Sequence, residues 1–142
     1  MTGNPTSPAL IKWMGLIEKS RRGTVNGKRH PHQPAVLLCF VSSASANEPR
    51  MINWVDGKLL WKATITSHGG SGSPESPITA LVNAEILSSS CKLARTASSP
   101  PARKVLDSEN PLVGLPEEIW NLIVGNPSTK TQVCDFLRSQ LD

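Results

Sequence analysis

The chain has 142 residues and a net charge of +4, with 38% hydrophobic and 18% charged residues, twelve prolines and ten glycines. This length suits one domain with a single core, and no apolar run reaches the roughly 18 residues that a membrane-spanning helix needs. The N-terminus also lacks the charged-then-apolar layout of a signal peptide. We therefore expect a soluble, cytoplasmic protein with no membrane partner, in which many loops connect short elements.

Apolar spacing predicts two helices near the start of the chain. Residues 8–18 place Leu10, Trp13 and Ile17 at helical intervals, which is typical of an amphipathic helix. Residues 34–46 begin with proline, which suits a first helical position, and they are apolar on almost every side. They indicate a central buried helix, although the same run would also suit a strand.

A third helix is predicted over residues 51–65. It should be opened by Asn53 or interrupted near Gly57. The side chains that we expect to point inward from it are Trp54, Leu59, Leu60 and Trp61.

The second half of the chain predicts one irregular segment and two further helices. Short apolar groups in residues 77–93 read as a small strand pair or an irregular layer over the core. Residues 116–124 form a short helix with two acids in its first turn, and a last helix starts at Pro127 or Ser128. The fold class is therefore mainly α with a small β component, in a single compact helical domain spanning residues 1–142.

Three loops without apolar periodicity separate these elements. Residues 20–33 and 95–104 are basic, and residues 67–76 are rich in glycine and serine. Cations on a loop that precedes a helix add their charge to the positive helix N-terminus, and both attract phosphate. We expect these three loops to form the binding surface. The cations that crowd the first thirty residues are Lys12, Lys19, Arg21, Arg22, Lys28 and Arg29.

Sequence patterns disfavour catalysis and metal binding. The chain has no GxSxG nucleophile motif, no Walker loop and no HNH nuclease layout. The three histidines, His30, His32 and His68, would need distant ligands to complete a metal site. The three cysteines lie far apart without a CxxC pair, so we expect reduced, mostly buried thiols at Cys39, Cys91 and Cys134. We predict a non-enzymatic protein without a cofactor.

Three stretches of this sequence resemble a known family. "KRHPHQPAVLLCFV" is similar to the "R-x-P-H-K-P-L-L-L-L" signature of the DNA sulfur-binding domain found in McrA-like type IV restriction endonucleases. In "PESPITALVNAEI", Ser76, Pro77 and Ala80 stand where the family has an aromatic residue, a proline and an alanine. The closing stretch "GLPEEIWNLIVGNPSTKTQVCDFLRSQL" is similar to the final pair of helices in the family.

The resemblance implies binding of double-stranded DNA in which sulfur replaces one non-bridging phosphate oxygen. Arg29 is the residue that we expect to pair with the modified phosphate, and Pro77 and Ala80 should form an apolar wall for the sulfur. The full set expected to bind DNA and sulfur is Arg29, His30, Ser76, Pro77, Ala80, Lys28 and His32. Contacts to flanking phosphates are expected from Arg21, Arg22, Arg95, Arg103 and Lys104. A nuclease partner would be fused to the reader or recruited by it.

This sequence departs from the family pattern at two positions. It has no tyrosine, so Ser76 replaces the aromatic wall, and Gln33 replaces the usual lysine of the signature. Either the pocket is walled differently in this chain or sulfur binding is weaker.

Two other functions are compatible with the sequence. One is a protein-interaction module that grips a partner in an apolar groove around Trp54 and Trp61. The other is a general DNA-binding domain that is indifferent to sulfur. Binding to matched duplexes with and without one sulfur separates the three.

Overall fold

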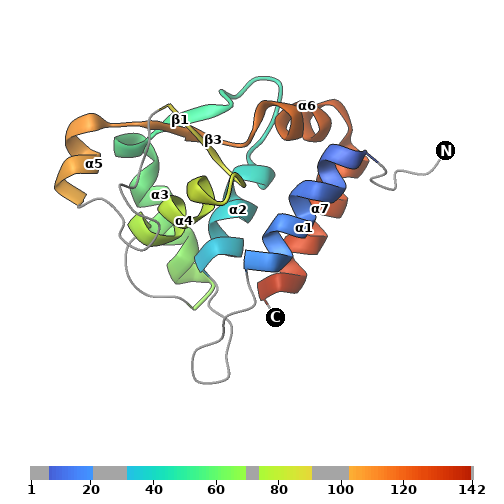
Figure 1. The fold of residues 1–142 in the computed structure, drawn as a ribbon, viewed down its shortest axis with the longest axis horizontal. Coiled ribbons are helices and arrows are strands. Elements are labelled where there is room, and N and C mark those ends of the chain that lie inside the picture. The colour runs from blue at the N-terminus through green and yellow to red at the C-terminus, as the bar shows by residue number, and fades with distance from the viewer. Residues whose placement is uncertain (1–6, 21–31, 70–73, 91–102, 142) are drawn as a thin grey trace.

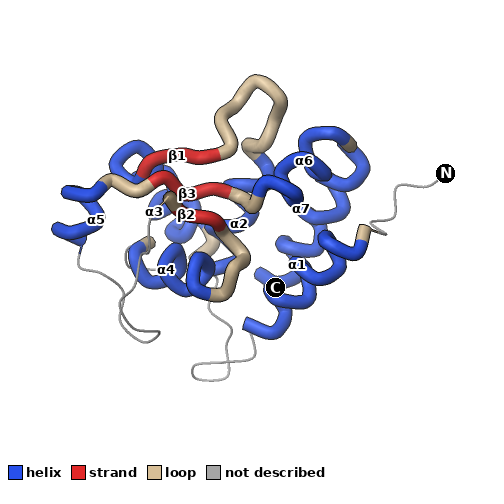
Figure 2. The backbone as a smooth tube through the Cα atoms, turned by 45° about the horizontal axis from the view of Figure 1, so that its top comes forward, coloured by secondary structure: helices blue, strands red, loops and turns tan. Residues whose placement is uncertain are grey.

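The computed structural model describes residues 7–20, 32–69, 74–90 and 103–141, and for Ser20, Ser76 and residues 103–105 it describes the backbone alone. Over these ranges the chain forms seven helices and three short strands (Figures 1 and 2). The helices are α1 (Pro8–Ser20), α2 (His32–Ser42), α3 (Trp54–Ser67), α4 (Glu75–Asn83), α5 (Arg103–Glu109), α6 (Glu117–Gly125) and α7 (Pro127–Leu141). The strands are β1 (Met51–Asn53), β2 (Ser88–Ser89) and β3 (Leu112–Gly114). The predicted fold class, mainly α with a small β component, is confirmed.

Helix α2 forms the centre of the core because its sequence offers almost no polar face. Seven of its eleven residues are buried, and it contacts α3, α4 and α7. Figure 1 shows α2 in the middle of the domain, with α3 and α4 on one side and α1 and α7 on the other. Trp13 of α1 donates its indole N–H to the carbonyl oxygen of Ile86 at 2.8 Å, which ties α1 to the turn after α4. None of the described helices has the length and apolar character needed to cross a bilayer.

The sheet is antiparallel, and its central strand comes last in the chain. β3 lies between β1 and β2, so Gly114 stands opposite both Met51 and Ser88. A Cβ atom at Gly114 would overlap the backbone carbonyl of Arg50. Glycine is required at this close backbone approach.

Helix α3 has the predicted N-cap at Asn53, but residues 51–53 form β1 and not the first turn of the helix, and two of its leucines do not point inward. The Asn53 side chain accepts a hydrogen bond from the backbone N–H of Asp56 at 2.9 Å, so Asn53 is the N-cap. The buried stripe of α3 consists of Trp54, Gly57, Trp61 and Ile65. Leu59 and Leu60 fall outside this stripe and are 72% and 49% exposed, so the prediction of their burial is wrong.

The prediction of a strand pair or irregular layer over residues 77–93 is also wrong for most of that segment, because α4 occupies its first half. Pro77 lies in the first turn of α4, where the backbone N–H groups have no partner within the helix, so proline is tolerated there. Ile78 and Leu81 are buried one turn apart. Among the described residues of this region, 77–90, the two residues of β2 are the ones that form a strand.

Each of the three predicted loops extends slightly into a helix. α2 starts at His32, before the end of the predicted loop 20–33, and α4 starts at Glu75, before the end of 67–76. α5 starts at Arg103, within the predicted loop 95–104. The two C-terminal helices agree with prediction, since α6 begins at Glu117 and α7 at Pro127.

The described thiols are free and largely withdrawn from water. Cys134 is buried and Cys39 is half-buried. Burial raises the pKa of both thiols above the usual value, so both are neutral at pH 7. Cys91 lies outside the described residues.

Helix α4 ends in a Schellman motif that holds Glu85 in the left-handed region. Glu85 has φ 63°, its N–H donates to the carbonyl of Val82, and the Ile86 N–H donates to the carbonyl of Leu81 at 2.9 Å. Leu81 and Ile86 are both buried, as the hydrophobic contact of this motif requires. The position of Glu85 is one where glycine is normally preferred.

Replacing Glu85 by glycine is expected to stabilise the domain by about 0.5–1 kcal/mol. A residue with a Cβ atom is strained in the left-handed region, and relief of this strain outweighs the free-energy cost of the greater conformational entropy that glycine gives the unfolded chain. Urea unfolding monitored by circular dichroism measures this gain. Glu85→Ala removes the carboxylate but keeps the Cβ atom, so it should give no such gain. Equal stabilisation by both variants would show that charge, and not backbone strain, is responsible.

Candidate nucleic-acid interface

The structure describes half of the twelve residues predicted to contact DNA. Those outside the described residues are Arg21, Arg22, Lys28, Arg29, His30 and Arg95. Ser76, Arg103 and Lys104 are described by their backbone alone, and His32, Pro77 and Ala80 are described in full.

His32 is the first residue of α2 and is half-buried. The rest of α2 is packed in the core, so the position of His32 is set by a rigid helix and not by a loop. In Figure 1 the N-terminal end of α2 lies toward the same lower end of the domain as the C-terminal ends of α1 and α3. The N-terminus of α2 adds a partial positive charge at that end.

Helix α4 carries the predicted sulfur wall and packs against α2. Pro77 is buried and Ala80 is exposed, so the two side chains differ in their access to a ligand. Of the two wall residues whose side chains the structure describes, Ala80 is open to solvent and Pro77 lies in the interior.

The N-terminus of α4 has no side-chain cap. Pro74 occupies the N-cap position and makes no capping hydrogen bond from its side chain. An uncapped N-terminus attracts anions, although the carboxylate of Glu75 in the first turn opposes this attraction.

Asp107 has a positioning role in α5 that the sequence does not indicate. Its Oδ1 atom accepts hydrogen bonds from Trp54 Nε1 at 2.7 Å and from Lys58 Nζ at 2.9 Å. These bonds join α5 to α3 and so hold the helix that begins with Arg103 and Lys104. The partners are about fifty residues away in the chain, so no local pattern reveals the contact.

The predicted interaction groove around Trp54 and Trp61 is not formed. Trp54 is 1% exposed and Trp61 is 0% exposed, and their ring centroids lie 6.0 Å apart in the core. Neither indole ring is accessible for contact with a partner protein. Among the described residues, no group of three or more histidine, cysteine, aspartate or glutamate side chains could hold a metal ion.

Comparison with known proteins defines the class of this domain. The sequence profile described as "ScoMcrA-like, DNA sulfur-binding domain" matches residues 10–141. The class is thus that of DNA sulfur-binding domains, and the match covers nearly the whole chain. The chain belongs to the ScoMcrA-like family of these domains, and the resemblance predicted from its sequence is confirmed.

Solved structures share the fold at low sequence identity. The sulfur binding domain of ScoMcrA complexed with phosphorothioated DNA is 20% identical, with a TM-score of 0.78, over 89% of this chain and 84% of that chain. The sulfur binding domain of SprMcrA complexed with phosphorothioated DNA is 20% identical, with a TM-score of 0.69, over 90% of this chain and 84% of that chain.

A longer ScoMcrA structure contains both the sulfur binding domain and an SRA domain, with phosphorothioated DNA. It is 20% identical, with a TM-score of 0.76, over 86% of this chain but only 40% of that chain. No curated protein matches the sequence significantly.

Proposed function

We propose that this chain binds phosphorothioate-modified double-stranded DNA in a preferred sequence context, without catalysing a reaction on it. The single observation that carries the proposal is membership of the DNA sulfur-binding domain family over residues 10–141. The loops 20–33, 67–76 and 95–104 would form the binding surface, and the exposed Ala80 on α4 would lie beside the sulfur.

Discrimination between sulfur and oxygen would depend on the apolar character of this site. A phosphorothioate keeps the negative charge of phosphate, but its sulfur is large, polarizable and poorly hydrated. Burying a few tens of Å² of sulfur at about 25 cal/mol per Å² contributes roughly 1 kcal/mol. An oxygen in the same place would lose water hydrogen bonds, which costs about 1–3 kcal/mol. The penalty on oxygen therefore contributes at least as much as the attraction of sulfur.

Affinity would come from charge. Arg29 is assigned to the modified phosphate, with Lys28, His30 and His32 nearby in the sequence. The flanking phosphates are assigned to Arg21, Arg22, Arg95, Arg103 and Lys104. Each neutralised phosphate releases counterions, so binding should weaken markedly from low to moderate salt.

Titration of two matched duplexes that differ by one phosphorothioate tests this function. The modified duplex should bind about 30-fold or more tightly, from the roughly 2 kcal/mol or more estimated for the sulfur site. Equal binding would instead support a DNA-binding domain that is indifferent to sulfur. Binding of neither duplex at low salt would exclude DNA as the ligand.

The variant Ala80→Glu is expected to reduce the affinity ratio between the modified and unmodified duplexes toward one, because a carboxylate would replace the apolar surface next to sulfur. Ala80 is exposed, so the change should not disturb the core, whereas Pro77 is buried. Ala46→Glu is the matched control, since Ala46 is exposed in the connection after the other end of α2. Equal losses for both duplexes in Ala80→Glu would contradict the role of Ala80.

A further inference from the structure

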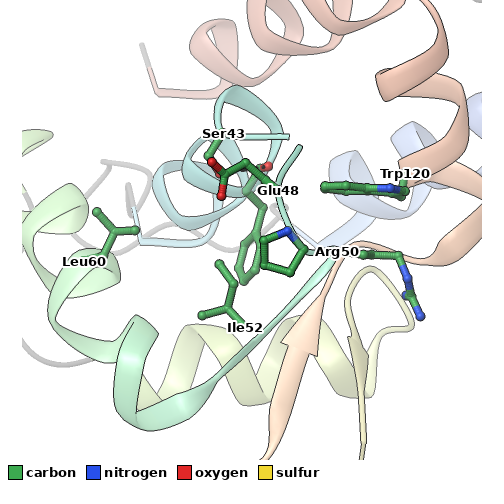
Figure 3. Close-up of a pocket in the computed structure, with 8 residues that line it drawn as sticks. Ser43, Glu48, Arg50, Ile52, Leu60 and Trp120 are labelled. Carbon is green, nitrogen blue, oxygen red and sulfur yellow. Dashed lines mark hydrogen bonds between the residues drawn. The ribbon is translucent and has the colours of Figure 1, made fainter. Parts of the chain in front are cut away.

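A cleft of about 150 Å³ opens at the C-terminal end of α2, and none of the residues that line it is among those assigned to DNA (Figure 3). It is walled by α2, the connection to β1, α3 and α6. The residues that line it are Phe40, Ser43, Glu48, Pro49, Arg50, Ile52, Leu60 and Trp120. We call this cavity the Trp120 cleft. Its surface is mainly apolar, and of its two aromatic residues Phe40 is buried and Trp120 is half-buried.

The Trp120 cleft combines an apolar interior with an exposed carboxylate that lacks a salt-bridge partner. Glu48 lines the cleft and forms no ion pair with any residue that the structure describes. The cation nearest in sequence, Arg50, donates from Nη1 to the carbonyl oxygen of Leu115 at 2.7 Å. Figure 3 shows its guanidinium directed away from Glu48.

The other charged groups near the cleft increase this negative character. Glu117 and Glu118 are exposed in the first turn of α6, the helix that carries Trp120. Lys130, a cation on the neighbouring α7, donates its ammonium to the carbonyl oxygen of Ala44 at 2.9 Å. Both described cations in this region are thus engaged by backbone carbonyls, while the carboxylates face solvent.

We propose that the Trp120 cleft binds an arginine side chain presented by a partner protein. A guanidinium can stack on the indole face of Trp120 while it donates two parallel hydrogen bonds to the Glu48 carboxylate. Its aliphatic stem would pack against Ile52 and Leu60, and 49% of Leu60 is exposed beside the cleft. Lysine would fit less well, because its ammonium is a compact, strongly hydrated charge that cannot stack.

The Trp120 cleft and His32, a residue assigned to DNA, are at opposite ends of α2. His32 begins this helix, whereas Ser43 follows its last residue, and eleven residues of helix span about 16 Å. No residue that lines the cleft is among those assigned to DNA, so the arginine site does not depend on the proposed DNA binding.

The probe is an acetylated pentapeptide amide, Gly-Leu-Arg-Leu-Gly, titrated into the full chain. The readout is the indole N–H resonance of Trp120 in a proton–nitrogen correlation spectrum, identified with Trp120→Phe. A saturable shift of that resonance is expected, with little change at the indoles of the buried Trp54 and Trp61. The matched peptide with citrulline in place of arginine keeps the shape but loses the charge, so it should bind about fivefold or more weakly. Absence of a shift, or equal binding of the two peptides, would overturn the proposal.

Glu48→Gln provides the complementary test on the protein. Glu48 is exposed, so the variant should fold normally and lose about fivefold or more in affinity for the arginine peptide. Glu18→Gln removes one carboxylate from the exposed face of α1 and should leave that affinity unchanged. If Glu48→Gln binds as the unmodified chain does, or if both variants weaken binding equally, Glu48 does not recognise the guanidinium.

Discussion

Gly114→Ala is expected to destabilise the domain by about 2–4 kcal/mol, a large part of the roughly 5–15 kcal/mol that holds a domain folded. A Cβ atom at this position would overlap the backbone carbonyl of Arg50 and lie 2.9 Å from the sulfur of Met51. Backbone atoms cannot rotate away as a flexible side chain can. Since Gly114 pairs with β1 and β2 at once, relief would have to move a whole strand of the sheet.

Urea unfolding measures this loss, and the midpoint should fall by roughly 1–2 M. Gly15→Ala is the matched control. Gly15 lies within α1, and a Cβ atom there would meet nothing within 4 Å. Alanine at this position should stabilise the helix by about 0.5–1 kcal/mol. If Gly114→Ala shifted the midpoint upward as Gly15→Ala does, the close approach between β1 and β3 would be wrong.

Arg29→Ala is expected to weaken binding of the modified and unmodified duplexes alike, by about 10- to 100-fold, because a charge-assisted contact to phosphate is lost from both. The expectation follows from the proposed function, and Arg29 lies outside the described residues. Fluorescence anisotropy with the two matched duplexes measures it. A loss confined to the modified duplex would place Arg29 at the sulfur instead of at a phosphate common to both.

The conservative variant Arg29→Lys separates charge from geometry. Lysine keeps the positive charge but not the planar fork, so its affinity should lie between those of the parent chain and Arg29→Ala. The slope of the logarithm of affinity against the logarithm of salt concentration should fall by about one in Arg29→Ala and stay unchanged in Arg29→Lys. An unchanged slope in Arg29→Ala would show that Arg29 does not neutralise a phosphate.

Two helices illustrate how far local sequence predicts this fold. The run from Pro34 to Val41 is apolar throughout and could have suited a strand, but its initial proline and the lack of a polar side favoured a buried helix, which is observed. Asn53 was a recognisable N-cap because its side chain bonds three residues ahead, to the Asp56 N–H. Interactions of this range are encoded in a few adjacent residues, so they are visible in the sequence.

Helix α4 shows where local sequence patterns fail to predict secondary structure. Pro77 and the short apolar groups around it suggested an extended segment. The helical spacing of Ile78 and Leu81 favours a helix only when both side chains are buried in the core, where α4 packs against α2. The same holds for Leu59 and Leu60, which are as apolar as core residues but lie off the face that contacts α2. Hydrophobicity alone does not specify which face of a helix is buried.

Residue types at short spacing were enough to predict the family and the helical character of the domain. Which apolar residues are exposed, the contact of Asp107 that joins α5 to α3, and the position of Glu48 and Trp120 around one cleft follow only from the folded chain. These features bring together residues separated by about fifty to seventy positions. Such contacts depend on how the helices pack around α2. Packing between distant residues leaves no periodic pattern in the sequence.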